Sequence, residues 1–220
     1  MRFWKYLTSI LVLVLTICSC NKKPTVLPLT IFNQNHRLIL GTSVALSVNE
    51  LLTASHICIV QDPNMPPEKM PLSFQGMHQK QMYVIYKTGY YPVHIQKIDY
   101  NWDLCLLKID ENILLPSKLA KADYQPQQFD KVFALGYPSG MGPILTEGYI
   151  TPQYQSTYPM FTQFHPPSIY ISSNAIYSGN SGGPLFDKDN QVIGIIIKVH
   201  AHYSHISIAV DIKTIHKFLD

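Results

Sequence analysis

The chain has 220 residues, of which 46% are apolar and 14% are charged. This length suffices for one mid-sized domain or two small ones, and the apolar content can fill a core, so the composition excludes an intrinsically disordered protein. The formal charge is only +3, and the basic residues Arg2 and Lys5 lie in a segment that we expect to be removed. So weak a charge gives no reason to expect a nucleic acid as a partner.

The first residues are typical of an export signal. A short basic start precedes an apolar run over residues 7–17, which is too short to cross a bilayer as a helix. The run ends in Ile17-Cys18-Ser19-Cys20, which resembles the bacterial lipobox and implies a signal peptide over 1–19 with lipid on Cys20. Bulky Ile17 makes Cys18 a poorer acceptor. Two acyl chains on Cys20 would anchor the protein stably to a membrane of the bacterial cell envelope. Secretion without lipid and a permanent transmembrane anchor are the alternatives.

Residues 20–36 are polar, contain proline and have no period, so we predict a tether. Short apolar runs then predict strands, separated by a long loop over 61–79 that contains four prolines. The predicted strands of this first half are 38–40, 44–46, 51–52, 82–87, 91–98 and 104–109.

Residues 111–126 lack a strand pattern and are predicted to cross between two halves, with the boundary near residue 125. The predicted strands of the second half are 131–135, 144–150, 168–172, 184–186, 191–198 and 206–210. Asp211 is then placed to cap a closing helix, because Ile212, Ile215 and Phe218 follow at helical spacing. Many short strands with one terminal helix predict an all-β barrel architecture.

The stretch Ser178-Gly179-Asn180-Ser181-Gly182-Gly183-Pro184-Leu185-Phe186 puts a serine among small residues. Glycines mark ordinary hairpin loops more often than sites. They also permit the tight turn that exposes a serine hydroxyl beside backbone amides, as a nucleophile requires.

Two upstream stretches favour the second interpretation. Leu52-Thr53-Ala54-Ser55-His56-Ile57-Cys58 and Asn101-Trp102-Asp103-Leu104-Cys105 give, with Ser181, the order His, Asp, Ser. Over roughly residues 38–218 the chain resembles the chymotrypsin-like serine peptidases. Within them, Gly179 to Leu185 and the stretch Val132-Phe133-Ala134-Leu135-Gly136-Tyr137-Pro138-Ser139-Gly140 are most similar to the HtrA (Deg) peptidases. No residues follow Asp220 that would form the PDZ module usual in that family.

The resemblance implies two six-stranded β-barrels, over 37–125 and 126–220, with a C-terminal helix. A hairpin and a helical turn over 53–59 would deliver His56 as the general base. Asp103 would orient the imidazole, and Ser181 would attack the carbonyl. The amides of Gly179 and Ser181 would form the oxyanion hole, and no metal or organic cofactor is needed.

The substrate is a protein or peptide on this interpretation, perhaps best described as exported or misfolded envelope protein. The resemblance places the walls of the pocket for the side chain before the cut bond at Ala175, Ile176, Ile196 and Ile197. None of these is acidic, which favours a small or medium apolar side chain over Lys or Arg. The oligomeric state is not predicted.

Two further groups leave alternatives open. Cys58 and Cys105 each lie two residues beyond a presumed catalytic residue, and either a disulfide or two buried thiols would suit an exported protein. His200, His202 and His205 lie close enough in sequence to hold a transition metal. A loop with solvated histidines is the preferred interpretation.

Two other functions compete with the peptidase. A binding or sensing lipoprotein would keep the fold without turnover, because an unformed oxyanion hole leaves no trace in sequence. An esterase would use the same three side chains on a smaller acyl substrate.

Overall fold

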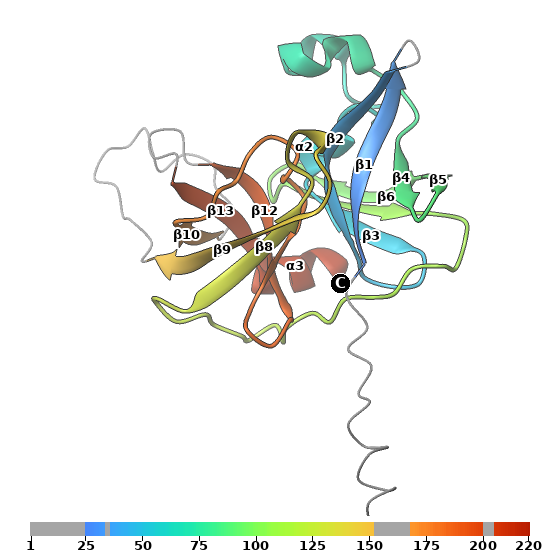
Figure 1. The fold of residues 1–220 in the computed structure, drawn as a ribbon. Helices are drawn as coiled ribbons and strands as arrows, with labels where there is room; N and C mark the ends of the chain where they lie inside the picture. The colour runs from blue at the N-terminus through green and yellow to red at the C-terminus, as the bar shows by residue number, and fades with distance from the viewer. Residues whose placement is uncertain (1–24, 34–35, 152–167, 200–204) are drawn as a thin grey trace, which may run out of the picture.

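The computed structural model describes residues 25–33, 36–151, 168–199 and 205–220. Two curled sheets lie side by side, one from each half of the chain (Figure 1). The first half contains β1 (Val26–Asn33), β2 (His36–Ala45), β3 (Glu50–Thr53), α2 (Ser55–Cys58), η1 (Pro67–Lys69), η2 (Leu72–Met77), β4 (Tyr83–Tyr86), β5 (Gly89–Pro92), β6 (His94–Asp99) and β7 (Leu104–Lys108). The second contains β8 (Lys131–Gly136), η3 (Pro138–Gly140), β9 (Ile144–Thr151), β10 (Ser168–Ser172), β11 (Pro184–Phe186), β12 (Val192–Val199), β13 (Ile206–Asp211) and α3 (Ile212–Leu219).

The first sheet has seven strands in the order β5-β4-β1-β2-β3-β7-β6. Its two edge strands are consecutive in the chain, because the strand predicted over 91–98 is divided at Val93. Val93 is fully buried, and its amide donates to the carbonyl of Met82 at 3.0 Å. The continuous chain therefore joins the two edges, and the sheet curls on itself where six strands were predicted.

The predicted tether is wrong for the stretch that forms β1. β1 pairs with β2 from Val26↔Val44 to Asn33↔His36, and Leu29 and Ile31 are fully buried. Pro28 and the polar residues around this stretch hide its strand character in the sequence. Proline is tolerated because a register shift follows at Leu29/Thr30 and interrupts the regular ladder. The first sheet thus begins at residue 26 and not at 37. The predicted signal peptide and Cys20 lie outside the described residues.

The second sheet is a closed barrel in the order β10-β13-β12-β11-β8-β9, as predicted for a six-stranded unit. Its strands lie at the predicted places. Its interior is filled by side chains such as Ile171, Leu185 and Ile195, each fully buried. The predicted boundary near residue 125 falls between β7 and β8.

The closing helix α3 begins as predicted. The carboxylate of Asp211 accepts a hydrogen bond from the amide of Thr214 at 2.7 Å and so caps the helix. Ile212, Ile215 and Phe218 form its buried face. Nε2 of His216 donates to the carbonyl of Ala120 at 2.8 Å, so the helix also holds the segment that connects the two sheets. Within the described ranges, no helix has the length and apolar character needed to cross a bilayer.

Candidate active site

Strand pairing in the first sheet brings His56 and Asp103 together. β3 and β7 run antiparallel, with Thr53 opposite Cys105. The chain that leaves β3 therefore lies beside the chain that enters β7. Because His56 follows Thr53 by three residues and Asp103 precedes Cys105 by two, both side chains reach the same end of this strand pair.

The carboxylate of Asp103 holds both the ring and the backbone of His56. Nδ1 of His56 lies 2.9 Å from Oδ2 and 3.1 Å from Oδ1. The amide of His56 donates to Oδ1 at 3.0 Å, and the hydroxyl of Ser55 donates to the same oxygen at 2.9 Å. The side chain of His56 is 35% exposed and that of Asp103 is 22% exposed. The carboxylate thus orients a ring that a substrate can reach.

A tight turn presents Asp103 to the histidine. Asp99 accepts hydrogen bonds from the amides of Asn101 and Trp102 at 2.8 and 3.0 Å, which closes the turn between β6 and β7. Asp103 then has φ of 52°, in the left-handed region that aspartate enters more readily than most residues. This conformation carries the chain from the turn into the buried strand.

A disulfide joins the two elements that carry the pair. Cys58 of α2 and Cys105 of β7 are bonded, with Cα atoms 6.6 Å apart, and both are fully buried. This settles the choice that the sequence left open. The bond ties the helix that bears His56 to the strand that follows Asp103.

The serine loop packs against the same end of the first sheet. Gly182 has φ of 82°, and a Cβ there would overlap Thr53 Oγ1 and the carbonyl of Thr42. Its amide donates to the carbonyl of Ile196 at 2.7 Å, and the amide of Ile196 donates to Gly183 at 2.9 Å. Only glycine permits this approach, which sets Ser181 beside the start of α2.

Thr42 of β2 fixes the serine loop across the boundary between the sheets. Its amide donates to the carbonyl of Ser181 at 2.8 Å, and its hydroxyl donates to the carbonyl of Gly179 at 2.7 Å. The same hydroxyl accepts from the amide of Tyr137 at 3.1 Å. Thr42 is fully buried, so it acts as a fixed point between β2, the serine loop and the end of β8.

Two amides of the serine loop remain available. Those of Asn180, Gly182 and Gly183 donate to the carbonyls of Tyr177, Ile196 and Asn180. Within the described part of the chain, the amides of Gly179 and Ser181 donate to no acceptor. The carbonyl of Ser178 accepts from the amide of Ser139 at 2.8 Å. Because carbonyl and N–H of a trans peptide point in opposite directions, the N–H of Gly179 points away from Ser139.

The hydroxyl of Ser181 donates to the carbonyl of Ile197 at 3.3 Å, and among the described residues it makes no hydrogen bond to the imidazole. Ile197 lies at a register shift of β12 against β13, which turns its carbonyl toward the serine. Lys198 follows it. Burial lowers the pKa of Lys198, while the charge of Asp103 acts in the opposite direction.

The residues predicted to wall a substrate pocket lie on both sides of Ser181. Ala175 is exposed, whereas Ile176, Ile196 and Ile197 are 7%, 1% and 4% exposed. None carries a charge. Their role in contacting a substrate stays a prediction.

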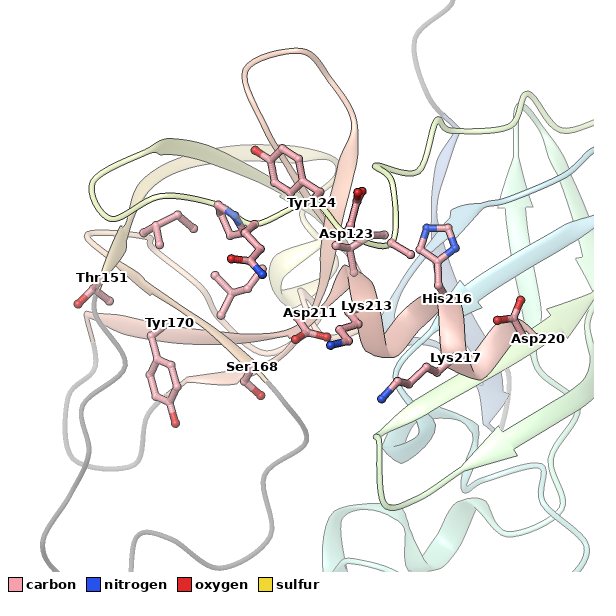
Figure 2. Close-up of a pocket in the computed structure, with 16 residues that line it drawn as sticks. Asp123, Tyr124, Thr151, Ser168, Tyr170, Asp211, Lys213, His216, Lys217 and Asp220 are labelled. Carbon is pink, nitrogen blue, oxygen red and sulfur yellow. The ribbon is translucent and has the colours of Figure 1, made fainter.

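A separate hollow of about 810 Å³ lies between α3, the connecting segment and the ends of β9 and β10 (Figure 2). Asp123, Tyr124, Tyr170 and His216 are among its lining residues, which include none of the three candidate catalytic side chains. Within the described ranges, no three His, Cys, Asp or Glu side chains are placed to share a metal ion. His200 and His202 of the histidine cluster lie outside those ranges.

The sequence matches the trypsin-like peptidase domain over residues 41–195, more than half of the chain. The chain belongs to the trypsin-like peptidase domain family. The segment of this trypsin-like domain that is matched runs from β2 to β12 and therefore includes His56, Asp103 and Ser181.

This trypsin-like domain is 36% identical to serine protease HTRA1B of Danio rerio over 138 residues, or 60% of the chain and 28% of the relative. It is 32% identical to serine protease HTR4 of Bos taurus over 145 residues, or 64% and 29%. The chain thus spans less than a third of these curated relatives. The expected similarity to HtrA proteins is confirmed.

Solved structures support the fold of the trypsin-like domain. The active form of the Rv3671c protease from M. tuberculosis matches with a TM-score of 0.69 at 17% identity, over 90% of this chain and 80% of that one. The HtrA-type protease AlgWS227A with tripeptide matches with a TM-score of 0.67 at 23% identity, over 89% and 59%. The predicted all-β, chymotrypsin-like fold with a C-terminal helix is therefore correct.

Sequence reasoning missed Thr42 and Ser55. Ser55 directly precedes His56, so a hydroxyl beside the base was visible in the sequence. Thr42 had no such signal, because its partners Gly179 and Tyr137 are distant in the chain and meet it only in the folded protein.

Proposed function

We propose that the protein is a serine endopeptidase that cuts peptide bonds through an acyl-enzyme on Ser181. The observation that carries the proposal is the bond between Nδ1 of His56 and Asp103 at 2.9 Å, beside the serine loop. With Nδ1 engaged as a donor, Nε2 carries the lone pair that takes the hydroxyl proton. Asp103 orients the ring and stabilises the imidazolium without taking the proton itself.

The reaction has two halves. Oγ of Ser181 attacks the carbonyl carbon as its proton passes to Nε2 of His56, and the imidazolium returns that proton to the departing amine. Water then attacks the acyl-enzyme with the same histidine as base, and the ester bond to Oγ breaks. Each half develops negative charge on the former carbonyl oxygen. The amides of Gly179 and Ser181 receive it, and losing one such donor typically costs about a hundredfold or more in rate.

The resting serine must first leave the carbonyl of Ile197. Rotation about a single side-chain bond moves Oγ between staggered positions and needs no backbone change. Hydrogen bonds in the catalytic groups of unliganded enzymes are often long, and they tighten when substrate arrives.

The proposed substrates are exported or misfolded proteins of the bacterial envelope. The neutral side chains of Ala175, Ile176, Ile196 and Ile197 favour a small or medium apolar residue before the cut bond. Lipid on Cys20, after removal of residues 1–19, would hold the enzyme at a membrane. Radiolabelled palmitate should enter the chain and should not enter a Cys20→Ala variant; unchanged incorporation would assign the lipid elsewhere.

A second function is favoured by the hydrogen bond from Ser181 to Ile197. A binding protein without turnover would keep the hydroxyl in this position permanently.

One experiment separates these functions. The full chain in detergent is incubated with an unfolded protein and with a fluorophosphonate probe, beside Ser181→Ala and a control, Ser117→Ala, which removes a buried hydroxyl in the connecting segment. We expect labelling and fragments from the parent and the control, and neither from Ser181→Ala. Labelling without fragments would favour an esterase or a narrowly specific protease. Neither signal in the parent would favour the binding protein.

A further inference from the structure

We infer that Ser55 is a positioning residue for the catalytic pair: its hydroxyl fixes the carboxylate of Asp103 in the orientation that serves His56. The inference rests on the proposed function and extends it to a fourth side chain. It starts from the hydrogen bond at 2.9 Å between Ser55 Oγ and Asp103 Oδ1.

Ser55 is well placed for this role. It is only 1% exposed, so water does not replace its hydroxyl as the partner of the carboxylate. It begins α2 and is adjacent to His56, so one short helix carries both the base and the group that holds the orienting acid. Hydrogen bonds to an ionised carboxylate are stronger than those between neutral groups.

The hydroxyl supplies a second anchor for the carboxylate. Without it, Oδ1 would keep the amide of His56 at 3.0 Å as its one anchor other than the ring. A carboxylate held at one point can turn about that bond, and the terminal torsion of aspartate is broad. With both donors on Oδ1, Oδ2 is directed at Nδ1, where it lies at 2.9 Å.

The hydroxyl also withdraws charge from the carboxylate. Its removal leaves a stronger partner for the cationic imidazole, so the neutral base should form at higher pH in Ser55→Ala. The charged groups that act on this carboxylate are His56 itself and Lys198 of β12, and the substitution changes neither. The acid limb of the kcat/KM profile is therefore expected to move to higher pH.

The test compares Ser55→Ala with Ser43→Ala in the full chain. Ser43 is a matched control, because it is equally buried but donates to the carbonyl of Leu27 at 3.2 Å, away from the site. For Ser55→Ala we expect kcat to fall about tenfold with KM within about twofold, as for loss of one hydrogen bond to a charged group, together with the shifted acid limb. Ser43→Ala should leave kcat and the profile unchanged.

A Ser55→Ala enzyme with the parent's kcat and acid limb would overturn the inference. If Ser55→Ala does not fold, the pair Ser55→Thr and Ser55→Val decides, because these side chains have the same shape and differ in the hydroxyl. Only the threonine variant should keep the parent's profile, and equal profiles would refute the role. Failure of the proposed function is recognised separately, by a parent enzyme that is inactive or by activity that survives Ser181→Ala.

Discussion

The strongest mechanical link in the site is Thr42, and replacing it by valine tests whether the first sheet shapes the serine loop. Valine has the same shape and removes only the hydroxyl. The carbonyl of Gly179 then loses its donor at 2.7 Å, and the amide of Tyr137 loses its acceptor at 3.1 Å. The amide of residue 42 still donates to Ser181.

The magnitude follows from the two backbone groups left without partners. A buried polar group that loses its hydrogen bond costs about 1–3 kcal/mol, so we expect the free energy of unfolding to fall by about 2–4 kcal/mol. For a chain of this size that lowers Tm by roughly 5–15 °C. The rate should also fall. Removing an oxyanion donor costs about a hundredfold or more, and displacing Gly179 without removing it should cost about tenfold in kcat.

Urea unfolding and steady-state hydrolysis of a peptide ester measure the two effects. The control is Thr30→Val in β1, where a buried threonine donates to the carbonyl of Leu38 at 2.8 Å, far from the serine loop. It should lose stability and keep kcat. If Thr42→Val lost stability as the control does and kept its full kcat, the serine loop would hold its shape without Thr42, and our reasoning about this contact would be wrong.

Two further predictions concern stability. Replacing Cys58 and Cys105 together by alanine opens a link that spans 47 residues, so we expect the free energy of unfolding to fall by about 2–4 kcal/mol; an unchanged urea midpoint would show that the disulfide adds nothing. Stability should also fall above about pH 10, because burial raises the pKa of Tyr100, Tyr124 and Tyr137, with the hydrogen bond to Asp62 adding to the effect at Tyr100. The unfolded chain then loses these protons first, and the stability present below its ordinary tyrosine pKa is lost as pH rises. Lys198 acts in the opposite sense, and Tyr100→Phe should flatten the alkaline decline in urea midpoints; a parent as stable at about pH 10.5 as at about pH 8 would contradict the argument.

Local patterns in the sequence were sufficient for most strands and for the closing helix. Alternating apolar residues and the cap at Asp211 act over a few residues, so their signals survive without the fold. β1 was missed for the same reason. Pro28 and its polar neighbours give no local period, and the stretch becomes a strand because β2 and β4 pair with it on either side.

The sequence alone determined the order of His56, Asp103 and Ser181, the glycines around the serine and the choice between β and α architecture, because each depends on residue type and short spacing. The tertiary structure alone decided that Cys58 bonds Cys105, that Thr42 grips the serine loop and that the Ser181 hydroxyl rests on Ile197. These contacts join residues that are distant in the chain. Their distances are set by how the sheets curl and pack against each other, which no single stretch of sequence encodes.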